Sequence, residues 1–558
     1  MGQLSNYLHT VRYLRPSQIY HQLWNRAFAA RPTQPVRHAP NLRDGVSGFG
    51  YLTPFAGRVS GDSEFCFLNV AHSGAKTGMV DWAATQMPKL WRYNLHYFDY
   101  LLDLTLPSEQ KAALINDWIG QCPPGMPDAW EAYPVSLRIV NWVKWLLVAP
   151  RSARSAAWDA SLYSQARWLN SNLEYHLLAN HLLKNAVALF FAGAYFSEAE
   201  ADTWLTRGWS LLRQELTEQF LPDGGHYERS PMYHSLCVVD YLDVLALIGS
   251  STALSSLEGM SKMQTRLVTI VDFLRDIALP DGEIPLFNDA AFGIAPVPQR
   301  VLDYAERVLE HSFAAEAPAH LSILDKPDSG YYGWRVNRDM LVVDCGAIGP
   351  DWQPGHAHCD TLSYELVLNG KRVVIDSGVY DYEAGPRRLL ARGTAAHNTI
   401  MLDGREQSEL WGVFRVARRA RPINPSINLA GEGVVFEGAH DGYRRINGHP
   451  VHRRRIEFDG ARMIEVIDEI RGTGQHRAQS RVRLHPDYEV VMNNDYATVR
   501  DASGQPIVRI EWYGVDTIEI EKGWYFPRFG VEQPCIALLM TRNASAPFRF
   551  GYRIRKVS

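Results

Sequence analysis

Residues 176–196, HLLANHLLKNAVALFFAGAYF, carry apolar side chains at intervals of three and four, the spacing of a buried helix. The same spacing recurs between about 90 and 315, in segments 95–104, 135–148, 209–220 and 232–249. Short stretches rich in Pro, Gly and Asp separate these segments, as in antiparallel helical hairpins. We therefore expect roughly nine to eleven helices whose pairs close into an incomplete (α/α) toroid.

After about residue 335 the pattern changes to short runs rich in Val, Ile and Tyr, divided by Asn-Gly, Asp-Gly and Ser-Gly turns. These runs predict antiparallel strands. They are 340–346, 361–370, 371–378, 398–404, 462–470, 496–501 and 507–514. The fold class that follows is α then β, with the toroid followed by an antiparallel β-sandwich or layered β-sheet domain.

The change of pattern lies near 318–335, where SILDKPDSGYYGW combines Pro, Asp and Gly. We expect three parts: an N-terminal extension packing on the toroid (1–85), the toroid (86–325) and the β-sheet domain (326–558). A chain of 558 residues is long enough for two to four domains at about 150 residues each.

The composition is that of an ordinary globular protein. The chain has 57 Lys and Arg against 61 Asp and Glu, a net charge of −4, and 46% of its residues are hydrophobic. Disorder, collagen and nucleic-acid-binding tails are excluded, so we expect no nucleic-acid partner. The six cysteines show no paired spacing and predict neither a disulfide framework nor a CxxC zinc site.

The start of the chain has no uninterrupted apolar core followed by a small-residue cleavage site. We therefore expect a cytoplasmic location for the sequence as written, or a periplasmic or secreted one if the start was truncated. The longest apolar stretch, 186–196, is shorter than the ~20 residues needed to cross a bilayer. We expect no membrane partner, and the sequence leaves monomer and homodimer open.

The segment GHAHCDTLSYEL (355–366) is the most unusual part of the chain. His356, His358 and Asp360 are spaced by two and share a face if the backbone is extended. Downstream, Asp376 ends one predicted strand and His397 begins another. Imidazole and carboxylate groups on neighbouring strands are typical ligands of a divalent metal. The alternative is that they are satisfied polar groups at strand ends.

In the helical half, Asn180 and His181 interrupt an apolar run. Buried polar side chains need partners or face a cavity. Asn180 and Lys184 are four residues apart on one face of the predicted helix, which would present an amide and a cation to a cleft. An interhelical hydrogen bond is the alternative.

The segment DGGHYERSPMYHS (223–235) predicts a helix start, with Ser230 as N-cap and Pro231 as the first helical residue. Tyr233 then lies in the first turn. The positive end of the helix dipole favours a phenolate there, which suits a tyrosine that exchanges protons. A tyrosine packed inside the ring with a capped hydroxyl is an equally good interpretation.

Two segments, 89–98 and 129–145, interleave aromatic rings with cations. Rings pack on sugar faces, and Arg pairs with carboxylate or sulfate, so we expect a polyanionic sugar. The residues are Trp91, Tyr93, Tyr97, Trp130, Tyr133, Arg138 and Trp142. Two Arg-rich runs, 385–392 with Arg387 and Arg392, and 451–458, would add positive charge. The alternatives are core packing for the rings and solvated loops for the arginines.

Five blocks occur in the order found in the heparinase II/III-like family of polysaccharide lyases, and the chain resembles that family over roughly 90–470. The blocks are 129–142, 174–193, 223–234, 355–382 and 392–407. The resemblance implies a helical toroid, antiparallel β-sheets and a substrate cleft between them. It also implies a lyase that cleaves a uronate-containing acidic polysaccharide, glycosaminoglycan or alginate-like, by β-elimination.

The same resemblance implies the catalytic roles. Asn180 would neutralise the uronate carboxylate, with His181 beside it as a substitute. Tyr233 would transfer protons with His356 as its partner. The carboxylate charge must be offset because the C5 proton is only weakly acidic.

For the metal, the resemblance implies that His358, Asp376 and His397 hold one structural divalent ion, zinc by preference, with manganese or calcium as alternatives. The substrate-binding set expected around the cleft comprises Trp91, Tyr93, Trp130, Arg138, Lys184, Glu228, Arg387 and Arg392.

Two other functions remain open from the residues. Helical toroids also host glycosidases with paired carboxylates, and Glu228 with Asp223 or Asp289 would be such a pair. A non-catalytic polysaccharide-binding or export-assembly protein is the other. The segment 10–28 resembles starts of relatives associated with exopolysaccharide gene clusters, so a biosynthetic role is open beside a degradative one.

Overall fold

The computed structural model describes residues 2–27, 36, 40–53, 58–60, 64–73, 80–149, 154–314 and 318–557. Its first elements are two helices, α1 (Gly2–Val11) and α2 (Pro16–Ala27). A small sheet follows, formed by β1 (Val59–Ser60), β2 (Glu64–Phe67) and β3 (Val70–Ser73).

The helical half contains nine α-helices among the described residues, together with one 3-10 helix. They are α3 (Lys89–Tyr97), η1 (Asp99–Leu102), α4 (Ser108–Gln121), α5 (Ala132–Val148), α6 (Ala156–Ser171), α7 (Ala179–Tyr195), α8 (Ala199–Gln219), α9 (Pro231–Gly249), α10 (Met260–Ile277) and α11 (Pro298–Leu309).

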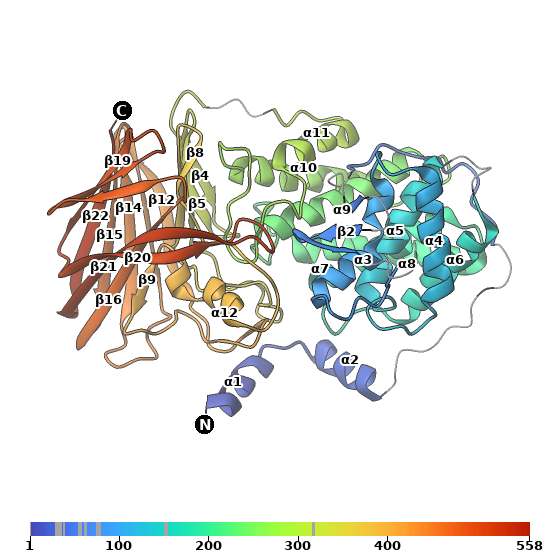
Figure 1. Cartoon of the computed structure of the whole chain (residues 1–558), viewed down its shortest axis with the longest axis horizontal. Coiled ribbons are helices and arrows are strands. Elements are labelled where there is room, and N and C mark those ends of the chain that lie inside the picture. The colour runs from blue at the N-terminus through green and yellow to red at the C-terminus, as the bar shows by residue number, and fades with distance from the viewer. Residues whose placement is uncertain are drawn as a thin grey trace.

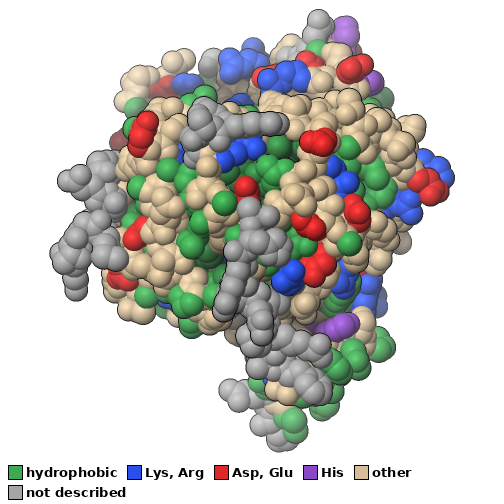
Figure 2. All heavy atoms as spheres, turned by 90° about the vertical axis from the view of Figure 1, so that its right-hand side faces the viewer, with side chains coloured by type: hydrophobic (Ala, Val, Ile, Leu, Met, Phe, Trp, Pro, Cys, Tyr) green, Lys and Arg blue, Asp and Glu red, His purple; other side chains and the backbone are tan. Residues whose placement is uncertain are grey.

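These helices form the expected open toroid. Along the ring α3 contacts α5, α5 contacts α7, α7 contacts α9, and α9 contacts α11. The inner helices α5, α7 and α9 are buried over most of their length, whereas α4, α8 and α10 keep an exposed face. Figure 1 shows this half on the right, and Figure 2 views it from its outer end.

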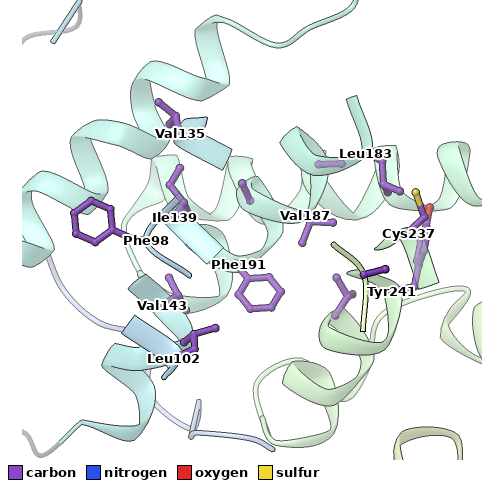
Figure 3. Close-up of a cluster of buried hydrophobic side chains, with 14 of the residues drawn as sticks. Phe98, Leu102, Val135, Ile139, Val143, Leu183, Val187, Phe191, Cys237 and Tyr241 are labelled. Atoms are coloured by element: carbon purple, nitrogen blue, oxygen red, sulfur yellow. The ribbon is translucent and has the colours of Figure 1, made fainter. Parts of the chain in front are cut away.

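The core of the toroid is apolar and closely packed. Ile139 of α5, Phe191 of α7 and Tyr241 of α9 converge between the inner helices (Figure 3). The backbones of α7 and α8 approach so closely at Gly193 that a Cβ there would lie 2.4 Å from the amide nitrogen of Leu205. This close approach explains why the long apolar segment 176–196 contains a glycine.

Helix α9 is the one helix in the described ranges that is long and apolar enough to span a membrane by length and composition. However, 72% of that stretch is buried inside the protein. Because its neighbours α7, α10 and α11 cover it, α9 has the environment of a core helix.

The C-terminal half, on the left of Figure 1, is built from strands. The first group is β4 (Ser322–Lys326), β5 (Tyr331–Val336), β6 (Asp339–Asp344), β7 (Tyr364–Leu368), β8 (Lys371–Val374), β9 (Ile400–Leu402), β10 (Leu410–Trp411) and β11 (Arg415–Val416). Between β8 and β9 lie α12 (Pro386–Arg392) and η3 (Thr394–Ala396). The second group is β12 (Pro422–Ala430), β13 (Gly433–His440), β14 (Val451–Phe458), β15 (Met463–Arg471), β16 (Gln475–Leu484), β17 (Glu489–Met492), β18 (Tyr496–Arg500), β19 (Pro506–Tyr513), β20 (Thr517–Tyr525), β21 (Gln533–Ser545) and β22 (Phe548–Lys556).

These strands form two large antiparallel sheets packed face to face. One has the order β12-β13-β14-β15-β22-β19-β18-β17, and the other has β20-β21-β16-β8-β7-β6-β5-β4 with β9 added on β16. A shared apolar layer lies between them, in which Trp334 of β5 stacks on Phe458 of β14 with ring centroids 4.0 Å apart. Side chains alternate in and out along β14 and β15, as antiparallel strands with one buried face require.

The fold class predicted from the sequence is confirmed, and each of the seven predicted strand runs contains a strand. Two helix predictions differ in detail. The segment 95–104 is interrupted at Phe98, which has φ 59°, and the long helix begins at Ala179 because Leu178 and Ala179 both have positive φ. Positive φ in non-glycine residues is uncommon and marks a tightly constrained turn.

The change from helices to strands lies between Leu309 and Ser322. Of the N-terminal extension, α1 contacts the β half, where its Thr10 accepts a hydrogen bond from Trp411. Helix α2 contacts the toroid, and Arg15 just before it pairs with Glu218 at 2.6 Å. The described part of the extension thus touches both halves, and the domain limits at 85 and 325 stay predictions.

Candidate active site

Four of the residues singled out in the sequence meet where the toroid faces the β half. Tyr233 comes from the first turn of α9 and His356 from the loop between β6 and β7. Their rings stack with centroids 4.0 Å apart and planes 29° apart. Asn180, in the first turn of α7, and Glu228, just before α9, complete the group. The predicted proton-transfer pair is therefore in direct contact.

Ser230 fixes the position of Tyr233. As predicted, it is the N-cap of α9, and its Oγ accepts a hydrogen bond from the Tyr233 amide at 3.3 Å. The same hydroxyl donates to the carbonyl of Asp289 at 2.6 Å and so ties α9 to the loop between α10 and α11. A single serine thus holds the tyrosine against the loop that supports His356.

The tyrosine is a phenol and not the phenolate that its place in the helix suggested. The Tyr233 hydroxyl lies 3.2 Å from the hydroxyl of Tyr382. Burial raises the pKa of Tyr233 well above its ordinary value, and the neighbouring Tyr382 adds to the effect. The expectation of a favoured phenolate is wrong because desolvation outweighs the modest helix dipole.

Asp289 fixes the protonation pattern of His356. Nδ1 of His356 lies 2.8 Å from Oδ2 of Asp289. Burial alone would raise the pKa of Asp289, but the charge of Arg388 and hydrogen bonds from His356 and His358 hold it well below its ordinary value. An ionised carboxylate only accepts, so Nδ1 carries a proton, and Nε2 is the nitrogen on the side of Glu228.

Asp289 also binds three other donors. Arg388 of α12 pairs with both of its oxygens, with Nη2 to Oδ2 at 2.8 Å, and His358 Nε2 lies 2.8 Å from Oδ1. The carboxylate is completely buried. A single carboxylate, both oxygens of which accept hydrogen bonds, therefore links His356 to His358.

Glu228 lies on the other side of His356. Its Oε2 is 3.5 Å from His356 Nε2 and has no hydrogen-bond partner in the described part of the chain. Its Oε1 accepts from Asn180 Nδ2 at 3.4 Å. Burial raises the pKa of Glu228, and His356 and the Asn180 amide only partly offset this. A buried amide and a buried carboxyl group thus converge on the Nε2 side of His356.

His181 and Lys184 have partners of their own. His181 Nδ1 lies 3.0 Å from Glu174, and its ring packs on Tyr133 with centroids 4.6 Å apart. Lys184 pairs with Asp240 at 2.7 Å. That ion pair lines a cavity of about 170 Å³ deeper in the toroid, between α5, α7 and α9. Lys184 therefore faces the toroid interior, one turn below Asn180.

Four of the predicted substrate-binding residues are structural. Trp91 and Trp130 are buried, and their indole nitrogens donate to the carbonyls of Val70 and Cys122. Arg138 is completely buried, donates to Gln165, and lies 4.0 Å above the ring of Trp118. Arg392 is 1% exposed and donates to the carbonyls of Ala357 and Val413. These predictions are wrong because the four side chains are buried and bonded within the protein, and so cannot reach a substrate.

Two other members of that set keep exposed surface. The Tyr93 hydroxyl donates to Glu131. Arg387 pairs with Glu532 at 2.6 Å and lies over Tyr380, with 49% of its side chain exposed. Their contact with substrate stays a prediction.

The expected metal-binding residues are close together, with one exchange. His358, Asp360 and His397 each offer a ligand atom, and these atoms lie within 4.8 Å of one another. Asp376 does not belong to this cluster, because its Oδ2 accepts from His397 Nδ1 at 2.7 Å. In this structure Asp360 takes the place that we expected for Asp376, which orients the histidine instead.

Unpaired atoms indicate that the cluster suits a cation. His358 Nδ1 and His397 Nε2 are buried and without hydrogen-bond partners among the described residues. Burial also raises the pKa of Asp360 to about 6, and His397 only partly offsets this. Two imidazole nitrogens and a carboxylate are a standard zinc donor set, so the residues fit a divalent ion.

The sequence reasoning missed two supporting residues. Arg388 lies in the Arg-rich run from which the sequence predicts only Arg387 and Arg392 as ligands of the substrate. Tyr382 ends one of the five family blocks, without a predicted role. Asp289 is predicted only as an acid of the alternative glycosidase. The available signal was the polar pair Asn288 and Asp289 within the otherwise apolar stretch 284–292.

Comparison with known proteins covers both halves of the chain. Residues 80–308 match the family model described as heparinase II/III N-terminus, and residues 322–552 match the model described as heparinase II/III-like, C-terminal. Two relatives are heparin-sulfate lyases. The one from Bacteroides stercoris is 24% identical over 63% of this chain and 53% of its own length. The one from Pedobacter heparinus is 26% identical over 62% and 52%. The chain thus spans about half the length of these curated relatives.

Solved structures resemble the chain in fold. A heparinase III crystal structure has a TM-score of 0.69 at 17% identity, covering 87% of this chain and 80% of that one. The heparan sulfate lyase HepC from Pedobacter heparinus has a TM-score of 0.59 at 19% identity, covering 87% and 79%. At these identities the likeness concerns the toroid followed by antiparallel sheets.

The buried ion pair at Asp289 gives a test of the site's construction. Arg388→Met removes the counter-charge and leaves a buried carboxylate uncompensated, so we expect a loss of about 3–5 kcal/mol in the free energy of unfolding. Thermal and urea unfolding would measure it. The matched control is Arg387→Met, whose exposed pair should contribute little. Equal effects of the two substitutions would contradict the role given to Arg388.

Proposed function

We propose, from the premise that this chain belongs to the heparinase II/III-like family, that it is a polysaccharide lyase acting on a uronate-containing acidic polysaccharide. The observation that carries the proposal is the stacked pair Tyr233 and His356, with Asn180 and Glu228 beside it. A phenol, an imidazole, an amide and a buried carboxyl group are groups that can carry out β-elimination of a 4-linked uronate.

The first step concerns the uronate carboxylate. The C5 proton becomes acidic only when the charge of the adjacent carboxylate is offset, because deprotonation places more negative charge on the same group. The Asn180 amide donates from one side. Glu228, whose pKa is raised by burial, would donate from the other side in its protonated form. Both interactions strengthen as the enolate-like charge develops.

The proton transfers then follow from the protonation states. His356 Nε2 holds the lone pair and accepts the C5 proton. The electrons of the C5–H bond form the C4=C5 double bond, and the C4–O4 bond breaks. The Tyr233 phenol, kept protonated by burial, donates its proton to the departing O4.

Paired-carboxylate hydrolysis is less well supported. Asp289 is fully buried and already accepts from His356, His358 and Arg388, so it can be neither nucleophile nor base. Asp223 accepts from the amide and hydroxyl of Ser329, both at 2.7 Å. Glu228 is therefore left without the second free carboxylate that a glycosidase needs.

The substrate class follows from the same chemistry. The proposed reaction requires a polymer with uronates linked through O4. Because the relatives are described as heparin-sulfate lyases, a heparan-type glycosaminoglycan is the first candidate. Alginate-like polyuronates and bacterial exopolysaccharides are the others. Incubation with each polymer should give an ultraviolet-absorbing unsaturated uronate. New reducing ends without that absorbance would indicate hydrolysis, and binding without new ends would indicate a non-catalytic protein.

We also propose one structural divalent ion, zinc by preference, held by His358, Asp360 and His397. Its chemistry would be to neutralise buried carboxylates and to fix the ring of His358. Asp376 would orient His397, and Asp289 would orient His358 through Nε2.

Tyr233→Phe should fold normally and lose nearly all turnover, at least a hundredfold, because only the proton-donating hydroxyl is removed. The product assay above measures this. The control is Tyr241→Phe two turns along the same helix, where a buried hydroxyl donates to the carbonyl of Leu212. That variant should keep its turnover. Substantial activity in Tyr233→Phe would rule out the tyrosine as the acid.

Asn180→Ala should depress kcat more than it raises KM, since the amide acts mainly on charge that develops in the transition state. Steady-state kinetics on the polymer that is cleaved would separate the two constants. A polymer with its uronates reduced to neutral hexoses should not be cleaved. Efficient cleavage of the neutral polymer would show that the carboxylate takes no part.

The metal proposal is tested by elemental analysis of the purified protein. We expect one divalent ion per chain, lost in His358→Ala and in His397→Ala, together with a lower unfolding midpoint because a structural ion contributes folding free energy. His452→Gln is the control. That histidine is equally buried and contacts Asp468, but lies outside the cluster. Metal-free wild-type protein of unchanged stability would overturn the proposal.

A further inference from the structure

The two N-terminal helices expose an apolar stripe to solvent and turn polar side chains toward the protein. The apolar side chains of α1 at positions 4, 8 and 11 follow helical spacing and are exposed by 71%, 65% and 47%. In α2, Ile19, Tyr20 and Leu23 form a second stripe, exposed by 38%, 57% and 60%. Surface helices of globular proteins normally bury such a stripe.

The polar faces of these helices are the ones that contact the protein. In α1, Thr10 donates to the carbonyl of Val416 and accepts from Trp411, and Ser5 accepts from Arg418. In α2, Gln18 is 2% exposed and donates to the carbonyl of Trp352. Hydrogen bonds therefore fix the helices with their apolar stripes outward.

The two stripes lie at one edge of the molecule. Figure 1 shows α1 and α2 one after the other along the lower edge, and Figure 2 shows several hydrophobic side chains at the lower end of the molecule. Exposed apolar side chains at helical spacing on two consecutive helices indicate an interaction site.

The charge of this segment indicates the partner. Residues 1–43 contain six arginines and no Asp or Glu, in a chain whose net charge is −4. Three of the arginines, Arg12, Arg15 and Arg26, flank the ends of the helices. A cationic segment with outward apolar stripes and Tyr and Trp side chains has the composition of helices that lie in an anionic membrane surface.

A second copy of the chain fits less well. In a two-fold interface the same patch meets itself, so the arginines of one copy would face those of the other. Like charges across an interface oppose association, whereas anionic lipid headgroups would neutralise the arginines of this segment other than Arg15 and Arg43, which pair with Glu218 and Asp202.

We propose that α1 and α2 dock the protein on an anionic lipid surface, with their apolar stripes in the headgroup region and no segment spanning the bilayer. This goes against the expectation of no membrane partner, which rested on the lack of a spanning segment. The proposal does not depend on the lyase activity.

Docking would hold the catalytic pair Tyr233 and His356 close to the membrane surface. Helix α1 packs on the hairpin of β10 and β11, whose turn carries Phe414. Phe414 contacts His356 and Tyr382, with ring centroids 6.2 Å and 5.4 Å apart. The docking helices and the catalytic pair thus lie on opposite sides of one short hairpin.

Vesicle co-sedimentation of the full chain tests the proposal. We expect binding to vesicles of phosphatidylglycerol and phosphatidylcholine in equal parts, little binding to pure phosphatidylcholine, and weaker binding at high salt. The double variant Leu8→Glu, Leu23→Glu should lower the bound fraction at least tenfold. Both positions are exposed, so folding should be retained, which the unfolding midpoint checks.

The matched control is Leu429→Glu, which places the same charge at a leucine that is 63% exposed on β12 and should leave binding unchanged. Absence of binding to the mixed vesicles at low salt would overturn the proposal. So would a concentration-dependent dimer that the double variant abolishes, because the stripes would then be a contact between copies. Equal binding to both kinds of vesicle would overturn the requirement for anionic lipid.

Discussion

The candidate site depends on one buried carboxylate. Asp289 accepts from Arg388, His356 and His358, and its own backbone carbonyl accepts from Ser230, the N-cap of α9. A buried charge persists only when it is paired and hydrogen-bonded, so the three side chains that donate to the carboxylate are required by its burial, and Ser230 adds a bond to the backbone of the same residue. The loop between α10 and α11 thereby joins the first turn of α9, helix α12 and the loop between β6 and β7. The two halves of the chain are connected at the point where the chemistry would occur.

The pattern of elements was predictable because it depends on local periodicity. Spacings of three and four, and of two, are set by which face of a helix or strand is buried, and Asn-Gly, Asp-Gly and Ser-Gly turns set the limits. Ser230 and Pro231 likewise marked the start of α9. The exceptions, at Phe98 and Leu178, are non-glycine residues with positive φ, a conformation imposed by tertiary packing that leaves no mark in the local sequence.

The site residues were predictable only in part, because whether a side chain is buried or exposed depends on tertiary packing and not on its neighbours in the sequence. Trp91 and Arg138 have the residue types of a sugar-binding surface, yet both are buried in the toroid. Arg387 and Arg388 are neighbours in helix α12, yet Arg388 points into the core and Arg387 stays at the surface. The resemblance located Tyr233 and His356, but it gave no role to Asp289 because nothing in a loop sequence states which distant groups it will touch.

The connection through Asp289 makes the protonation of two histidines interdependent. An ionised Asp289 requires a proton on Nε2 of His358, which leaves Nδ1 as the nitrogen free to bind a metal, and Nδ1 is the atom found buried without a partner. The same carboxylate requires a proton on Nδ1 of His356, so Nε2 is the nitrogen on the side of Glu228. One charge therefore determines which nitrogen each histidine presents: Nδ1 of His358 to the proposed metal site, and Nε2 of His356 to the proposed proton transfer. Because Arg388 keeps that charge ionised, an arginine outside the metal-binding cluster determines the orientation of both rings.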